Sequence, residues 1–84
     1  NETIRIELPN QVSFLNKGTI KDTLWSVPPG ARVIIDAGKA DYIDADVLDI
    51  LEDFKSTIVP EREIKLNMIG LKSKYELSDH VQFI

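Results

Sequence analysis

Residues 36–48 read Asp-Ala-Gly-Lys-Ala-Asp-Tyr-Ile-Asp-Ala-Asp-Val-Leu, and this stretch decides the fold. Just before it, Ala31–Ile35 has the continuous β-branched character of a strand covered on both faces, and Asp36 ends that strand. After Tyr42 and Ile43, Asp44 is a candidate helix N-cap, because a carboxylate there accepts orphan amide hydrogens and meets the positive end of the helix dipole. The stretch predicts a buried strand, a polar loop and the start of an acidic helix.

An amphipathic helix is predicted after Asp44 and is expected to end at Pro60. Its apolar residues recur at spacings of three and four: Val47, Leu48, Ile50, Leu51, Phe54 and Ile58. Its carboxylates point away from that face: Asp46, Asp49, Glu52 and Asp53. Beyond this helix, the alternation of apolar and polar residues over Ile64–Met68 predicts a last strand, which Gly70 ends.

The N-terminal segment alternates polar and apolar residues over Thr3–Leu8, which predicts a strand at a solvated edge of the sheet. Pro9-Asn10-Gln11 is a turn cluster. Because so few residues separate the two apolar runs, we expect an antiparallel hairpin to a second strand, Val12–Leu15.

A first helix is predicted over Lys17–Ser26, with Asn16 as its N-cap, and Pro28-Pro29-Gly30 ends it. Strands that alternate with helices of this length imply right-handed crossovers. The predicted fold class is therefore α/β: a mixed, mostly parallel four-stranded sheet with an N-terminal antiparallel edge strand and two to three helices. The third helix would begin near His80, and it is either short or absent because the sequence ends at Ile84.

Length and composition indicate one small domain, residues 1–84. A chain of 84 residues buries only about 60–65% of its unfolded surface, which is enough for one core. The sequence contains no cysteine, which removes disulfides and thiolate chemistry and agrees with a reducing compartment. No apolar run has the length of a membrane span, so this fragment is expected to be soluble. A net charge of −4 argues against nucleic acid and against an anionic membrane surface as partners.

Four segments of the chain resemble the STAS domain, most closely the cytoplasmic STAS domains that follow the membrane part of bacterial SulP anion transporters. Val12–Lys17 is similar to the second strand and first helix start of that family, Val33–Ala37 to its central strand, and Tyr42–Leu48 to its loop and second helix. Glu63–Gly70 supplies the next strand, so the resemblance covers roughly Thr3–Leu71. The order and spacing of all four segments carry the resemblance.

The resemblance implies a regulatory and interaction domain of a SulP-type transporter for sulfate, bicarbonate or dicarboxylates. Such a domain acts by protein–protein contacts on the cytoplasmic side of the inner or plasma membrane. Its expected partners are the membrane domain of the same transporter, a second copy in a homodimer and a cytosolic regulatory protein. The alternative is a free-standing signalling protein that resembles an anti-sigma-factor antagonist. In those antagonists a serine directly after the loop aspartate is phosphorylated, and here Ala45 occupies that position, so no phosphorylation is expected there.

The loop and the following helix start contain the candidate partner-binding or anion-binding residues, which we call the loop site: Gly38, Lys39, Asp41, Asp44, Asp46 and Asp49. A helix N-terminus can bind an anion, and Lys39 can assist it, although the crowding of carboxylates favours a plain connecting loop. Asp46 either imitates part of a phosphate's charge or only favours the helix dipole, and we prefer the second interpretation. The acidic helix face is either a surface for a basic partner or simply solvated.

Catalysis, cofactors and metal binding are not expected from this sequence. His80 is the only histidine, and it lies near no cysteine. The serines occur in no nucleophile motif: Ser13, Ser26, Ser56, Ser73 and Ser78. The helix carboxylates lie along a convex surface where nothing desolvates them. Trp25 is either a partner anchor or, as we prefer, an aromatic residue at the edge of the core.

Overall fold

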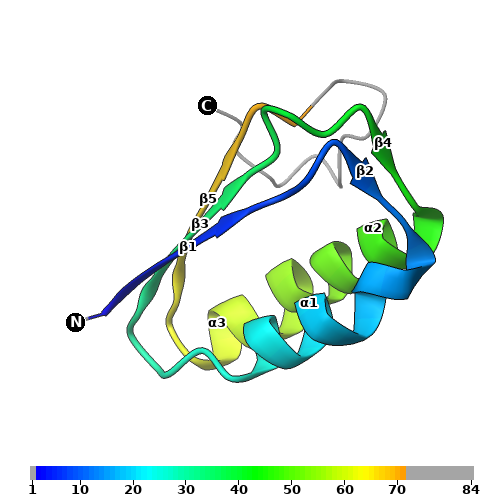
Figure 1. The fold of residues 1–84 in the computed structure, drawn as a ribbon. Coiled ribbons are helices and arrows are strands. Elements are labelled where there is room, and N and C mark those ends of the chain that lie inside the picture. The colour runs from blue at the N-terminus through cyan, green and yellow to red at the C-terminus, as the bar shows by residue number, and fades with distance from the viewer. Residues whose placement is uncertain (1, 72–84) are drawn as a thin grey trace.

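Three parallel strands form the main sheet of the computed structural model, which describes residues 2–71 (Figure 1). The strand order is β1-β3-β5, with β1 over Thr3–Glu7, β3 over Arg32–Asp36 and β5 over Lys65–Ile69. In this register Ile6 lies beside Ile35, and Ile35 lies beside Met68. The predicted mostly parallel α/β architecture is confirmed, with β3 as the central strand.

A second, two-stranded sheet pairs β2, Gln11–Val12, with β4, Tyr42–Ile43, also in parallel. Within residues 2–71 the four predicted strands therefore do not form one sheet, and the predicted antiparallel hairpin is wrong, because β1 pairs with β3 in parallel. The amide of Leu8 continues that ladder by donating to the Asp36 carbonyl, and the Asn10 carbonyl accepts from the Asp41 amide, both at 2.8 Å. After β1 the chain therefore keeps its direction and runs beside the loop that follows β3. Pro9-Asn10 contains no glycine, which a tight hairpin turn favours.

The helices α1, Lys17–Trp25, and α2, Ala45–Asp53, lie on the same side of the main sheet (Figure 1). A π-helical turn, η2 over Phe54–Ile58, and the short α3, Val59–Glu61, extend α2. The helix that was predicted to end at Pro60 therefore ends one residue later, at Glu61. The amide of Val59 reaches back to the Phe54 carbonyl, and this widened turn comes just before Pro60, whose ring would crowd a regular helix.

The segment before α1 differs from the prediction. The predicted strand Val12–Leu15 ends at Val12, and a 3₁₀ turn, η1, follows over Phe14–Asn16. Asn16 makes no side-chain cap bond to α1. Its side chain instead accepts from the Ser13 amide at 2.9 Å, while the Ser13 hydroxyl accepts from the Leu15 amide at 3.3 Å. This reciprocal capping box fixes the turn.

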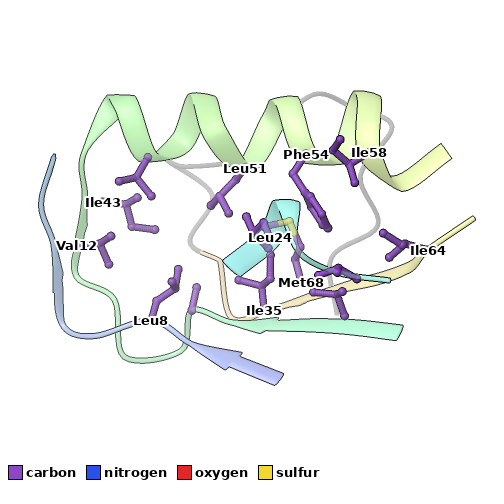
Figure 2. Close-up of a cluster of buried hydrophobic side chains, with 14 of the residues drawn as sticks. Leu8, Val12, Leu24, Ile35, Ile43, Leu51, Phe54, Ile58, Ile64 and Met68 are labelled. Carbon is purple, nitrogen blue, oxygen red and sulfur yellow. The ribbon is translucent and has the colours of Figure 1, made fainter. Parts of the chain in front are cut away.

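One hydrophobic core fills the space between the helices and the main sheet (Figure 2). Leu51 and Phe54 point from the long helix toward the strands and are fully buried, as predicted (Figure 2). The strand β3 is not covered equally on both faces: Val33 and Ile35 are buried, whereas Ile34 is only partly buried and Arg32 is exposed. The reason is that both helices pack on one face of the sheet.

Within residues 2–71, no helix combines the length and hydropathy that a membrane crossing requires. The third helix expected near His80, together with Ser73 and Ser78, lies outside the described residues.

Candidate functional site

The small β2·β4 sheet brings the start of α2 next to the segment that enters α1. The Asp44 amide donates to the Val12 carbonyl at 2.8 Å, which joins residues far apart in the sequence. Asp44 is the N-cap of α2, as predicted, and its Oδ2 accepts from the Asp46 amide at 2.8 Å. The Tyr42 hydroxyl lies 3.5 Å from the other Asp44 carboxylate oxygen. The Asp44 side chain thus satisfies one of the free amides of the helix N-terminus.

The loop between β3 and β4 is held by Asp36 at its start and by Asn10 from the connection between β1 and β2. Asp36 is paired with the Arg5 guanidinium on β1, and its Oδ1 accepts from the Gly38 amide at 2.9 Å. The Asn10 side-chain amide donates to the Lys39 carbonyl at 3.2 Å and to Asp41 Oδ2 at 2.8 Å. A connecting loop with this many internal bonds is a scaffold element as well as a surface.

Lys39 and the N-terminus of α2 do not form one anion site. The Lys39 ammonium lies 3.9 Å from Glu7 Oε2, at the end of β1. The Asp46 amide, which a bound anion would use, already donates to the Asp44 carboxylate. This geometry favours the connecting-loop interpretation of Gly38, Lys39 and Asp41 over the anion-binding one.

Two of the loop-site residues, Asp46 and Asp49, face α1 across an open hollow of about 410 Å³. The hollow is lined by Lys17, Gly18, Lys21, Asp46, Asp49 and Ile50. The Lys17 ammonium lies 3.3 Å from Asp46 Oδ2, and both side chains are about half exposed. Sequence reasoning identified the acidic side of this hollow but did not place Lys17 and Lys21 opposite it. The signal for the basic side was the pair of lysines, Lys17 and Lys21, one helical turn apart on α1.

The acidic face of the long helix, which consists of α2, η2 and α3, is partly neutralised by lysines of the same chain. Asp46 pairs with Lys17, and Glu52 pairs with Lys55, whose ammonium lies 3.5 Å away. Asp49 and Asp53 are exposed. The loop site therefore divides into a loop half held by Asn10 and a helix half beside α1.

Sequence reasoning also missed three exposed apolar side chains, which we call the apolar tip: Phe14, Leu15 and Tyr42. Their exposed fractions are 56%, 78% and 46%. Phe14 and Leu15 were expected in a strand, so their presentation on a capped turn was not anticipated. The spacing of Ser13 and Asn16 was the available signal for that turn.

Trp25 belongs to the edge of the core, which is the interpretation the sequence favoured. It is only partly buried, and its ring centroid lies 6.0 Å from that of Phe54. The Lys21 ammonium sits 5.5 Å from the Trp25 ring centroid. Arg62, which sequence reasoning missed, donates through Nη1 to the Trp25 and Val27 carbonyls, both at 2.9 Å.

Among residues 2–71, no group of three histidine, cysteine or acidic side chains is arranged to hold a metal ion. The core of the described part of the chain contains no buried polar or charged residue. The β2·β4 end presents apolar side chains, carboxylates and lysines. Comparisons with protein-family models, with curated proteins and with solved structures found no match for this chain.

Proposed function

We propose that this chain is the cytoplasmic regulatory and interaction domain of a SulP-type anion transporter, and that it acts through protein–protein contacts. The observation that carries the proposal is the convergence of the segments that resemble the STAS domain. Val12–Lys17 and Tyr42–Leu48 meet through the Asp44–Val12 backbone bond, and Val33–Asp36 lies in β3, the strand before β4. Two of the segments that carry the resemblance are therefore in contact although they are far apart in the sequence.

The work of such a domain is to bind and to transmit a change in position. Its backbone at the β2·β4 end is fixed by the Asp44 cap, the Ser13–Asn16 capping box and the bonds from Asn10. A rigid surface of this kind can couple to a neighbouring protein without losing much of its own conformational freedom. The partners that fit this function are the membrane domain of the same transporter, a twin copy in its dimer and a cytosolic regulator.

The alternative, a free-standing signalling protein switched by phosphorylation, lacks its acceptor at the expected position. Ala45 is the first residue of α2 and is exposed, so a kinase would reach it, but its methyl group cannot accept a phosphate. This observation favours the transporter function.

The experiment that tests the proposal begins with the full-length coding sequence. We expect many membrane spans encoded upstream of residue 1. We also expect the reconstituted full-length protein to transport sulfate, bicarbonate or a dicarboxylate, with a flux that changes when residues 1–84 are deleted. A coding sequence without membrane spans, or a flux indifferent to the deletion, would contradict the proposal. Trapping of an anti-sigma-type kinase by the isolated chain would support the signalling function in its place.

A further inference from the structure

The large apolar side chains with the greatest exposure in residues 2–71 gather at one end of the molecule. Tyr42 lies in β4, and Phe14 and Leu15 lie in η1, directly after β2. In Figure 1, β2 and β4 lie side by side at the end away from α3 and the N-terminus. Scattered single apolar side chains are normal on a surface, whereas a group at one end marks an interaction site.

The apolar tip is presented rigidly. The Ser13 amide donates to Asn16 Oδ1, and the Leu15 amide donates to the Ser13 hydroxyl, so the backbone between them is fixed. The turn also contacts the start of α2. Because little backbone freedom remains to be lost on binding, Phe14 and Leu15 can act as anchors at a low entropic cost.

Charges around the apolar tip indicate the kind of partner. Four carboxylates flank β4 or lie in the first half of α2: Asp41, Asp44, Asp46 and Asp49. Three lysines belong to the same surface: Lys17 pairs with Asp46, Lys39 lies 3.9 Å from Glu7 Oε2, and Lys21 lines the hollow with Asp49. The surface therefore has an apolar centre with an excess of negative charge, which suits an apolar segment that carries lysine or arginine. An anionic lipid surface would be repelled.

We propose that the apolar tip and its carboxylates dock a basic, amphipathic polypeptide segment. For the identity of that segment the inference rests on the proposed function: cytoplasmic loops of membrane proteins carry an excess of lysine and arginine, and the transporter's own loops are the nearest such segments. Phe14 and Leu15 anchor the apolar residues of the segment. Asp49, and Asp46 in exchange for its pair with Lys17, receive its cations at the rim of the hollow between α1 and α2.

The test uses the isotope-labelled 84-residue chain and a synthetic amphipathic helical peptide built from leucine and lysine, in the pattern Leu-Lys-Lys-Leu-Leu-Lys-Leu repeated. We expect saturable binding, with NMR shifts concentrated in residues 13–17 and 42–49. The variant Phe14→Ser/Leu15→Ser should bind about tenfold more weakly or worse, since each tenfold corresponds to about 1.4 kcal/mol. Asp46→Asn/Asp49→Asn should weaken binding several-fold and reduce its dependence on salt.

Matched controls separate a docking site from general attraction to an acidic protein. Glu2→Gln/Glu61→Gln removes the same charge at the opposite end, where both residues are exposed, and should bind like the wild type. A peptide with glutamate in place of lysine should not bind. Unchanged melting temperatures show that the variants are folded, and the shift map on the wild-type chain does not depend on any variant.

Several outcomes would overturn the inference. The first is that Phe14→Ser/Leu15→Ser binds the lysine peptide as tightly as the wild type does. The second is that the NMR shifts map to residues outside 13–17 and 42–49. The third is that the chain binds phosphatidylglycerol vesicles more tightly than the peptide. The inference would also be contradicted if the wild-type chain formed a concentration-dependent dimer that Phe14→Ser/Leu15→Ser abolished, because the apolar tip would then bind a second copy of the chain. If peptide binding follows the prediction but no transporter is encoded upstream, the docking site stands and the proposed function fails. If transport depends on residues 1–84 but the tip variants bind the peptide as the wild type does, the proposed function stands and the docking site fails.

Discussion

Single residues at helix ends decide how the elements of this chain are joined. Asp44 caps α2 as its sequence position predicted, because a carboxylate before an apolar helix has few alternatives. Arg62 was not predictable, since nothing in its neighbourhood along the sequence indicates that it reaches the carbonyl groups at the end of α1. Local rules identify caps formed by neighbours and miss caps that depend on the tertiary fold.

Ala45 should make the helix start inert to phosphorylation. Incubation with a kinase that acts on anti-sigma-factor antagonists should leave residues 44–47 unmodified, because Ala45 has no hydroxyl. Ala45→Ser should remain folded, with a stability change within about 0.5 kcal/mol, as is usual for an exposed site. Mass spectrometry of the treated wild-type chain checks the first expectation, and a phosphate anywhere in that stretch would refute it.

Arg62→Met should destabilise the domain by about 1.5–3 kcal/mol, because it removes a charged donor from the Trp25 and Val27 carbonyls. The methionine keeps most of the apolar stem, so the loss reports the hydrogen bonds. Arg32→Met is the control, since Arg32 is exposed on β3 and its replacement should be nearly neutral. Urea unfolding of both variants makes the comparison, and equal midpoints would show that Arg62 does not join the two elements.

At the scale of elements, periodicity predicted the long parts of the fold and failed for the short ones. The apolar positions of α2 and the β-branched run of β3 extend far enough for their periods to be recognised. The strands β2 and β4 contain only two residues each, too few to show alternation. The hairpin prediction relied on the turn cluster and the short connection, whereas pairing was decided by the strand β3, which offered β1 a long apolar neighbour in parallel.

The same limits apply to the candidate site. Its acidic residues were predictable because they are adjacent in the sequence. The separation of Lys39 from the start of α2, and the hollow shared with Lys17 and Lys21, depend on how the elements pack. The exposure of Phe14 and Leu15 was missed for a simpler reason, since apolar residues beside a predicted strand were assumed to continue it.

The junction between β5 and the loop after β3 depends on two glycines in close contact. A Cβ on Gly70, whose φ is 71°, would lie 2.7 Å from the Gly38 Cα. Gly70→Ala should therefore cost about 2–4 kcal/mol from the left-handed conformation and the backbone clash together.

Gly18→Ala is the matched control for that prediction. Gly18 lies in α1, and a methyl group added to it would meet no other atom within 4 Å, so the substitution should raise stability by up to about 1 kcal/mol. Thermal melts of the two alanine variants should move in opposite directions. A Gly70→Ala protein as stable as the wild type would mean that the loop is not held against β5.

At the scale of the whole molecule, stability depends on one core between the long helix and the main sheet. Phe54 is fully buried and packs against Trp25, so Phe54→Ala should cost about 3–5 kcal/mol. The free energy of unfolding of a domain of this size is roughly 4–13 kcal/mol in total. The variant should therefore unfold at room temperature in a low concentration of denaturant.

Phe14→Ala provides the comparison, because it removes the same ring from a side chain that is 56% exposed. It should change stability by no more than about 0.5 kcal/mol. Calorimetry or urea titration of both variants separates the core phenylalanine from the surface one. An unchanged melting temperature for Phe54→Ala would show that the buried face of the helix is misassigned.

The central claim, that this domain serves a SulP-type transporter through contacts at its β2·β4 end, is tested most directly by anion flux. The measurement compares the reconstituted full-length transporter with its Asp46→Lys/Asp49→Lys variant. The isolated variant should stay folded, since losing the exposed Lys17–Asp46 pair and a favourable dipole interaction costs about 1–2 kcal/mol in all. Glu2→Lys/Glu61→Lys is the control for charge reversal at the opposite end.

We predict that Asp46→Lys/Asp49→Lys alters the rate of sulfate, bicarbonate or dicarboxylate uptake, or the dimer contacts of the cytoplasmic part, while the control matches the wild type. Wild-type flux and wild-type oligomeric state in the Asp46→Lys/Asp49→Lys protein would contradict the claim.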